Sequence, residues 1–536
     1  MTRNKYWVLA ILFLILIINN WSIPFWDQDE PAYAGFARNM NASGDYTVPH
    51  FFFSDDHRKT PLHFWNIALS FKIFGENEFA TRFPSVLAIF GTFLLLLKQG
   101  AKISNKDSSF WAVIALGTSF LVPSLAKVSV TDATVLFFTT LTAFGIINTL
   151  LSPSRKWIFL TWLGFALGLL TKGPPIIIFA GLFSTFLFVF HPSRFNLLKL
   201  RPWFFLPLAF IPVVLWGYAT YLRDDGAFLS WMYWWYVEKR ISGSVYGQTG
   251  YMGTHFVLMI VFFLPTLMYF FTGLAQGFKG LIKKEPRYII IMGWFISGWL
   301  FYEFSPSKLP AYVIAAHVPL ALLIGEQAVK HLRRGEKKVF SLTVIHYIVN
   351  YTLAIGLILL PALFHQLDFL KDMTVPDELR YVLIIIGATY FILLSAQLFL
   401  WKSEKFIHLQ FASAIILSLS IWIFAPQFTE LTNSSKKVSE YVLSHTDEEY
   451  TFYIAHSPGK QPSLPFYLGA HKNFIELSTD YSLFQSKIDS NEKFVLILNK
   501  DQANHLKTLT GELDFHIISS QLIDRKDKAT YYIYIN

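Results

Sequence analysis

Residues 131–151 read TDATVLFFTTLTAFGIINTLL, and the only charged residue in this run is Asp132, at its second position. A helix that crosses the hydrocarbon core of a bilayer needs about 20 consecutive, mainly apolar residues. The run therefore predicts a membrane-spanning helix that begins next to Asp132. Twelve further apolar runs lie on both sides of it: 6–24, 80–97, 108–125, 156–171, 174–190, 203–222, 254–274, 287–303, 309–329, 339–361, 379–401 and 407–426.

The composition agrees with an α-helical polytopic membrane protein of about 13 transmembrane helices. Soluble domains carry about 25% charged residues, whereas this chain has 15% charged and 53% hydrophobic residues and a mean hydropathy of +0.41. The absence of cysteine excludes disulfides, thiol nucleophiles and cysteine-ligated zinc. The net charge of +9 does not indicate a nucleic-acid partner, because the basic residues lie mostly in short loops between the apolar runs.

The placement of these basic residues predicts the topology, because Lys and Arg concentrate in short cytoplasmic loops. Bulky residues, not a small-residue cleavage site, follow run 6–24, so we expect it to remain as the first helix. The chain is then an integral protein of the plasma (inner) membrane with a cytoplasmic N-terminus. Nearly all basic clusters of short loops fall on the inside: Lys98, Lys102, Lys106; Arg155, Lys156; Arg194, Lys199, Arg201; Lys279, Lys283, Lys284, Arg287; Lys330, Arg333, Arg334, Lys337, Lys338; Lys402, Lys405.

This topology leaves three long segments outside: a first loop at 24–79, a second at 223–253 and the tail from about 427. We therefore divide the chain into a transmembrane domain, 1–426, and a soluble extracytoplasmic α/β domain, 427–536. Within the tail, an amphipathic pattern predicts a short helix, and apolar runs bounded by polar residues predict strands. The expected helix is 436–443, and the expected strands are 451–455, 494–498, 516–519 and 531–535.

The first outer loop opens with three acids, Asp27, Asp29 and Glu30. Carboxylates at this place are candidates for a general base or for binding a cation. Alternatively, they cap a helix over 32–40, because acidic residues and Pro31 suit a first helical turn. The residues alone leave both interpretations open.

Basic residues on the outside are more informative, because they run against the usual charge bias. Lys172 and Lys308 lie in tight turns between apolar runs, Lys239 and Arg240 follow an aromatic stretch, and Arg58 and Lys59 lie in the first loop. Each of these side chains could alternatively extend its charge to the membrane–water interface without forming part of a binding site. Together they favour a site for an anionic headgroup such as phosphate. Asp132 either caps its helix or pairs with one of these cations. The spacing of His50, His57, His63 and His255 forms no metal motif.

An ordered set of short motifs resembles the ArnT/protein-mannosyltransferase-like family of GT-C membrane glycosyltransferases. It covers residues 1–330 well, and the rest by architecture. The matching segments are Asp29-Glu30, Ala37-Arg38-Asn39-Met40, Ser43-Gly44-Asp45-Tyr46, Val48-Pro49, Lys59-Thr60-Pro61-Leu62, Trp65, Phe74-Gly75-Glu76, Glu78-Phe79, Ala80-Thr81-Arg82-Phe83-Pro84-Ser85, Thr171-Lys172-Gly173-Pro174, and Ser307-Lys308-Leu309-Pro310 with Tyr312.

The resemblance implies a lipid-linked sugar donor and a role for each matching residue. Asp29 matches the family's catalytic acid, with Glu30 beside it as a second candidate. Lys59, Lys172 and Lys308 match positions near the lipid phosphate. Arg240 is expected to bind the donor phosphate with these lysines, and Glu238 and Arg240 match a Glu-His-x-Arg-like segment. Glu238, Tyr312 and, from the interpretation of the residues above, Asp132 are the expected supporting residues of the site. The chain has Arg58 and Lys239 where the aminoarabinose transferases of lipid A carry potential metal ligands, which argues against a bound divalent cation and against aminoarabinose specificity.

The sequence thus predicts an inverting glycosyltransferase that moves a sugar from a polyprenyl-phosphate carrier to an extracytoplasmic acceptor. A lipid A-like lipid, a protein hydroxyl and another envelope glycan all remain open as acceptors. The alternative is a transporter or lipid flippase. That class predicts charged residues near the bilayer midplane and broken helices in paired positions, and neither is evident.

Overall fold

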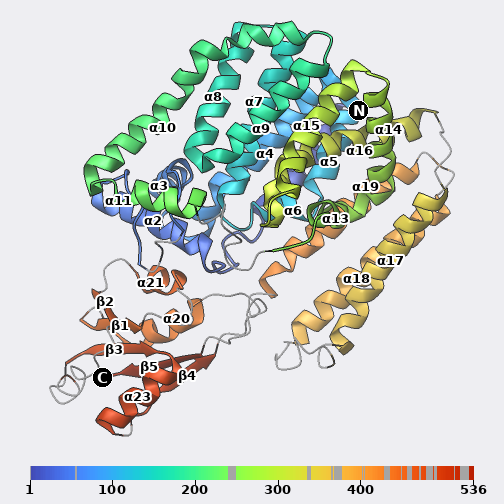
Figure 1. Cartoon of the computed structure of the whole chain (residues 1–536). Helices are drawn as coiled ribbons and strands as arrows, with labels where there is room; N and C mark the ends of the chain where they lie inside the picture. The colour runs from blue at the N-terminus through green and yellow to red at the C-terminus, as the bar shows by residue number, and fades with distance from the viewer. Residues whose placement is uncertain are drawn as a thin grey trace.

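The computed structural model describes residues 2–536 except 53, 55–56, 239–248, 335–339, 364–365, 367–376, 401–402, 404, 428–434, 448, 456–460, 470–472, 478–486, 488–491, 512 and 520–529. A long helical body carries a small sheet domain at one end (Figure 1). The helices of the body are α1 (Thr2–Ile17), α4 (Glu78–Ile103), α5 (Lys106–Gly117), α6 (Leu121–Ser124), α7 (Thr131–Leu151), α8 (Arg155–Lys172), α9 (Pro174–Phe190), α10 (Pro202–Asp224), α13 (Thr254–Phe262), α14 (Leu267–Ile282), α15 (Pro286–Glu303), α16 (Ile314–Arg334), α17 (Phe340–Leu363), α18 (Asp377–Phe399) and α19 (Lys405–Ile423).

All the apolar runs of the sequence coincide with these helices, which confirms the polytopic helical class. Within the described residues, seven helices are long and apolar enough to cross a membrane, and α13 with α14 forms an eighth candidate that is bent by 72°. The bend follows from Pro265, which lacks the N–H that a continuous helix requires. The number of 13 spans stays a prediction.

Residues 24–79, the predicted first outer loop, form two short helices under one end of the body. α2 (Asp29–Ser43) begins at the acidic cluster, and α3 (Leu62–Phe74) follows. Asp29 and Glu30 lie in the first turn of α2, but its N-cap is Gln28 and no side chain makes a capping hydrogen bond. α2 buries Tyr33, Phe36 and Met40 against Phe64 of α3 and forms a separate apolar cluster. Glycine 44 ends α2 with a left-handed φ of +71°, a conformation that costs glycine little. This layer fixes where the acids of the loop can point.

The tail is an α/β sheet domain, and the four predicted strands and the predicted helix are confirmed. The sheet has the order β2-β1-β3-β5-β4, with β1, β2 and β3 parallel and β5 antiparallel to both β3 and β4. Its elements are α20 (Lys436–His445), β1 (Thr451–Ala455), α21 (Ser463–Leu468), β2 (Asn473–Leu477), β3 (Phe494–Leu498), α23 (Lys500–Thr510), β4 (His516–Ser519) and β5 (Thr530–Ile535). β3 is buried along its whole length, as a central strand should be.

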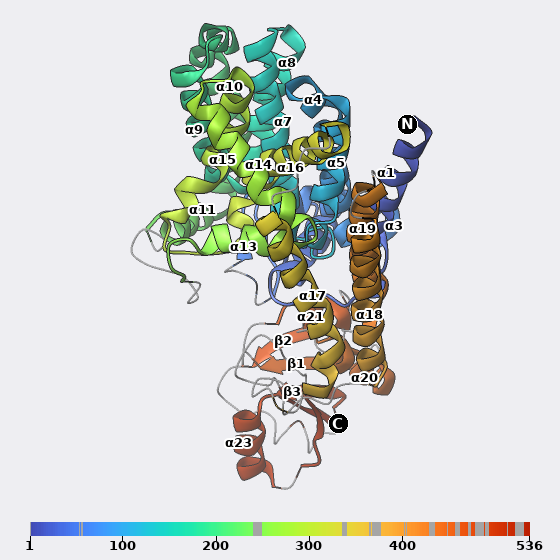
Figure 2. The same cartoon turned by 90° about the vertical axis from the view of Figure 1, so that its right-hand side faces the viewer.

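The sheet domain lies next to the α2–α3 layer, at the end of the body away from the α7–α8 connection (Figure 1). The α17–α18 hairpin projects at the edge of the helical body in Figure 1 and lies along α19 in Figure 2, where Gln397 of α18 donates to the Ser413 hydroxyl of α19 at 2.9 Å. Its surface exposes large apolar side chains such as Ile348, Tyr381 and Ile392. A lipid environment removes the cost of exposing them, which agrees with a hairpin inside a bilayer.

Candidate functional site

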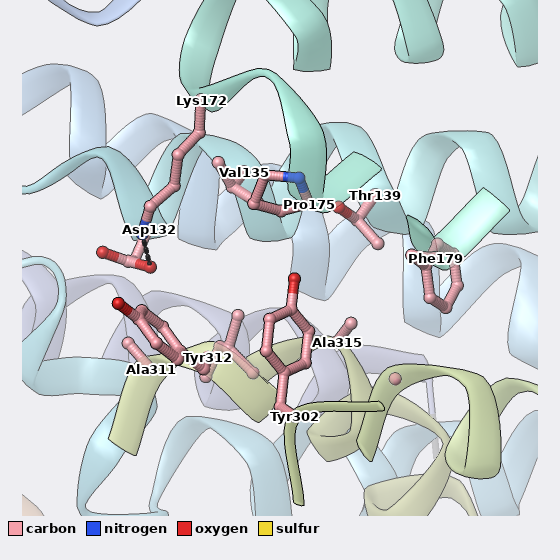
Figure 3. A pocket seen from close by; sticks show the side chains of 12 residues that line it. Asp132, Val135, Thr139, Lys172, Pro175, Phe179, Tyr302, Ala311, Tyr312 and Ala315 are labelled. Carbon is pink, nitrogen blue, oxygen red and sulfur yellow. Dashed lines mark hydrogen bonds and ion pairs between the residues drawn. The ribbon is translucent and has the colours of Figure 1, made fainter. Parts of the chain in front are cut away.

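A pocket lies where the ends of α7, α8 and α15 meet (Figure 3). Its empty space, about 380 Å³ including the part open to solvent, has Asp132, Lys172, Tyr302 and Tyr312 as polar lining side chains besides Thr139. Lys172 is the last residue of α8, and Asp132 lies in the first turn of α7. The lining thus combines an acid, a cation and two phenols at the ends of helices.

The turn after α8 aims Lys172 into this pocket. Gly173 has a φ of +71° and a ψ of −111°, a conformation that side chains other than hydrogen rarely permit, and Pro174 then starts α9. The Lys172 ammonium donates to an Asp132 carboxylate oxygen at 2.6 Å and lies 5.7 Å from the centre of the Tyr312 ring. Asp132 is therefore the partner of an outer cation, as one of the two sequence interpretations expects.

A second acid–cation cluster surrounds Asp29 at the start of α2. Asp29 accepts hydrogen bonds from the Tyr33 hydroxyl at 3.2 Å, lies 2.9 Å from His57 Nδ1, and has the Lys59 ammonium 3.7 Å away. Lys59 also donates to the Tyr33 hydroxyl. Half of the Asp29 side-chain surface remains exposed, so a small molecule can still reach this carboxylate.

The electrostatics hold Asp29 ionised. Partial burial would raise the pKa of Asp29, but the Lys59 charge and the His57 contact outweigh it, so the pKa lies well below its usual range. Burial lowers the pKa of Lys59, Asp29 opposes that shift, and Lys172 lowers it further. The two clusters are also neighbours in space: the Tyr33 ring lies 5.8 Å from the ring of His63, and His63 Nδ1 lies 3.2 Å from the hydroxyl of Thr134, two residues after Asp132 on α7.

The structure separates the other expected residues from this site. Glu30 is fully buried, and Arg82 donates to its two oxygens at 2.7 and 2.8 Å. The backbone N–H groups of Trp26 and Ser129 also donate to them. With both oxygens occupied in a dry environment, Glu30 holds the fold together and is not placed to accept a substrate proton.

Lys308 points away from the pocket, although the sequence predicts a place for it near the lipid phosphate together with Lys172. Its ammonium donates to the backbone carbonyls of Tyr302 and Glu303 and lies 3.5 Å from the Glu303 carboxylate, with 4% of the side chain exposed. It is not among the residues that line the pocket. Glu238 is exposed at the end of a short helical turn, η3 (Trp234–Glu238), and Arg240 lies outside the described residues.

The donor set does not fit a resident metal ion. No three His, Asp or Glu side chains of the described residues come together as ligands. The one carboxylate–imidazole pair of the site, Asp29 with His57, already faces the Lys59 ammonium. Lys59 therefore supplies the positive charge at this place.

Three residues of the site were not predicted: Tyr33, His57 and Tyr302. Tyr33 follows Asp29 by four residues on α2, so helical spacing is the signal that could have identified it. His57 precedes Lys59 by two residues in an irregular loop, where no periodicity indicates direction. Tyr302 ends an apolar helix and carries no sequence signal that separates it from a membrane-interface tyrosine.

Known proteins with similar sequences and folds agree with the resemblance. The family described as dolichyl-phosphate-mannose-protein mannosyltransferase matches residues 58–217. Undecaprenyl phosphate-alpha-4-amino-4-deoxy-L-arabinose arabinosyl transferase 1 of Proteus mirabilis is 25% identical over 452 residues, which cover 82% of this chain and 79% of that protein. The transferase of this name from Aeromonas hydrophila is 27% identical over 358 residues, 64% of this chain and 63% of its own length.

The fold has a solved counterpart over its whole length. The crystal structure of ArnT from Cupriavidus metallidurans bound to undecaprenyl phosphate superposes with a TM-score of 0.75 at 15% identity, and the match covers 100% of this chain and 97% of that one. Its structure in the apo state gives a TM-score of 0.74 at 14% identity. The family match, the sequence relatives and this fold agree, and the chain is an integral membrane protein that is similar to the ArnT-type membrane glycosyltransferases.

Proposed function

We propose that this enzyme transfers a sugar from a polyprenyl-phosphate carrier to an acceptor outside the cytoplasm, with inversion at the anomeric carbon. The convergence of two lysine–carboxylate pairs, Lys59–Asp29 and Lys172–Asp132, on one site carries the proposal. The site offers two cations that can bind a phosphate and a carboxylate that can accept a proton. The names of the relatives, and the undecaprenyl phosphate in the Cupriavidus metallidurans structure, support this donor class.

The reaction balances with the groups of the site. An acceptor oxygen forms a bond to C1 of the sugar while the bond from C1 to the phosphate oxygen breaks. The polyprenyl phosphate leaves with that electron pair and gains negative charge. Lys59 and Lys172 stabilise this growing charge, and electrostatic terms of this kind are often the largest in catalysis. Arg240 is a further candidate for this role by its motif.

Asp29 is the proposed general base, and donor binding adjusts its basicity. A donor phosphate that draws Lys59 toward itself removes the nearest positive charge from Asp29. The pKa of Asp29 then rises from its depressed value toward the ordinary range, where a carboxylate accepts a proton more readily. Donor binding thereby prepares the base for the acceptor.

Release of free lipid phosphate separates this function from transport. Purified protein in detergent or liposomes is given a polyprenyl-phosphate sugar and an extract of envelope acceptors, and free polyprenyl phosphate is measured. A transferase releases it in step with sugar transfer. A transporter or flippase moves the intact donor and releases none, and that result would sink the proposal.

Lys172→Ala should weaken binding of polyprenyl phosphate by about 1–3 kcal/mol, the scale of a hydrogen bond to a charged group. The variant also leaves Asp132 without its cation, so the Lys172→Ala/Asp132→Asn double variant separates lost attraction from new repulsion. Lys102→Ala is the matched control, because Lys102 donates to Asn148 at 2.7 Å in a predicted inner loop. Titration with polyprenyl phosphate gives the affinities. Equal losses in the Lys172 and Lys102 variants would contradict the assignment.

We also propose that the sheet domain lies outside the cytoplasm of a plasma (inner) membrane protein, with the N-terminus inside. The one-sided basic loops support this topology. A reporter that is active only outside the cytoplasm, fused after Asn536, should be active. An inactive reporter on a well-expressed fusion would contradict the topology and would place the site on the wrong side for an extracytoplasmic acceptor.

A further inference from the structure

The sheet domain hydrogen-bonds to Asp27, two residues before Asp29. Asp27 is buried, with 5% of its surface exposed, and accepts the Ser463 backbone N–H at 3.0 Å on one carboxylate oxygen. The Ser463 hydroxyl donates to the other oxygen. Ser463 is the first residue of α21. A buried carboxylate that lost these donors would pay a large desolvation cost, so the contact holds the Asp27 backbone firmly.

Ser463 is itself fixed inside the sheet domain. The backbone N–H of Ser435 donates to the Ser463 hydroxyl oxygen at 3.0 Å, and the Ser435 hydroxyl lies 3.0 Å from the hydroxyl of Tyr531 on β5. The chain of contacts therefore runs from the sheet, through Ser463, to Asp27. A shift of the domain is transmitted to the first outer loop.

Further contacts from α21 surround the same segment. The Phe25 N–H donates to the Tyr467 hydroxyl at 2.8 Å, and the Phe25 ring lies 4.9 Å from the ring of Phe466. Tyr467 in turn donates to Glu78 at the start of α4, at 3.0 Å. The backbone carbonyl of Phe466 accepts from Arg38 of α2 at 2.8 Å. α21 thus contacts the chain before α2, α2 itself and the start of α4.

Asp29 lies between two anchored acids that belong to different parts of the protein. Asp27 is held by the sheet domain, and Glu30 is held by Arg82 of the helical body. The exposed Asp29 carboxylate projects from the short segment between them. A carboxylate that must meet a substrate oxygen within hydrogen-bond distance depends on such anchoring, because a misplacement of 1 Å can cost about 100-fold in rate.

We propose that the sheet domain is a positioning element of the active site, with Ser463 and Tyr467 of α21 as positioning residues that hold the segment carrying Asp29. The inference rests on the proposed function, because it assigns the domain a part in sugar transfer. It predicts that loosening α21 lowers kcat and leaves the donor KM unchanged, since Lys59 and Lys172 make no contact with α21 in the described structure.

The test variant is Ser463→Ala/Tyr467→Phe, which removes the hydroxyl that donates to Asp27 and the hydroxyl that accepts from the Phe25 N–H, and nearly preserves side-chain volume. We expect its kcat to fall by on the order of 100-fold, with an unchanged donor KM. Ser463→Thr keeps a hydroxyl and should retain most of the activity. Asn499→Ala is the control, because it removes the cap of α23 inside the sheet domain and does not touch the interface.

Spin labels report whether the domain stays in place. The chain has no cysteine, so Ser43→Cys on α2 and Ser444→Cys on α20, both exposed, give two unique labels. The distance distribution should be narrow in the parent and in the Asn499→Ala protein, and broad in the Ser463→Ala/Tyr467→Phe protein. A broad distribution together with a normal kcat overturns the positioning role. So does an Asn499→Ala loss of kcat equal to that of the interface variant, because general domain stability would then explain both.

Measurements on the wild-type protein distinguish a failure of this inference from a failure of the proposed function. A wild-type protein that releases no polyprenyl phosphate from any donor offered refutes the transferase proposal, and the positioning role falls with it. A wild-type protein that transfers sugar, with a kcat insensitive to the interface variant, refutes the positioning role alone.

Discussion

Asp29→Asn should lower the rate of sugar transfer by about 100- to 10,000-fold, the range for loss of a general base. Asparagine has nearly the same shape and still accepts the Tyr33 hydrogen bond, so the variant should fold. It no longer attracts Lys59, which is then free to turn to the donor phosphate. Donor binding should therefore be no weaker than in the wild type, and single-turnover transfer with saturating donor isolates the chemical step.

Asp45→Asn is the matched control for this prediction. Asp45 lies in the same outer loop and pairs with Arg223 at 2.8 Å, away from the two lysines of the site. It should transfer sugar at the parent rate. An Asp29→Asn enzyme that transfers at nearly the wild-type rate would leave Asp29 with a structural role only, and Asp132 would become the next candidate base, because Arg82 already occupies Glu30.

The sequence predicted the kinds of groups in the site better than their partners. Lys172 and Asp132 are both marked by position, since each charge interrupts an apolar stretch at the outer face. The pairing of Lys172 with Asp132, and not with another acid, depends on how α7 and α8 pack. Lys308 carries the same sequence signal as Lys172, yet it turns toward Glu303, because the Glu303 carboxylate and the backbone carbonyls at the end of α15 lie within its reach.

The helices and strands could be predicted where the hydrophobic pattern was strong. Prediction failed where tertiary contacts determine the structure. The strand β3, FVLIL, is uniformly apolar and was found with its correct bounds. The strand β2, NFIEL, was missed because Asn473 and Glu476 interrupt its apolar character, and edge strands tolerate such residues. The contact of Ser463 with Asp27 joins positions 436 residues apart, and no local pattern encodes it.

Among residues that contact the α2–α3 layer, Arg82→Met should be the most destabilising single change. It should lower the free energy of unfolding by about 3–5 kcal/mol, the cost of breaking a buried ion pair by removing one partner. Arg82 and Glu30 are both fully buried, and the guanidinium also donates to the backbone carbonyls of Asn20, Ile23 and Pro24 beyond α1. Without Arg82, the Glu30 carboxylate and these carbonyls lose their donors together. Thermal unfolding in detergent measures the loss.

The double variant Arg82→Met/Glu30→Met should recover a large part of that stability, because it removes the stranded charge as well as its partner. Arg223→Met is the exposed comparison: the Arg223–Asp45 pair is open to water on the arginine side, so its loss should cost about 1 kcal/mol or less. A double variant that is no more stable than Arg82→Met would show that the carbonyl contacts beyond α1, and not the charge of Glu30, account for the effect. In that case the transfer rate of Glu30→Gln should remain near that of the parent, because Arg82 would still hold the exit of α1 and the segment that carries Asp29.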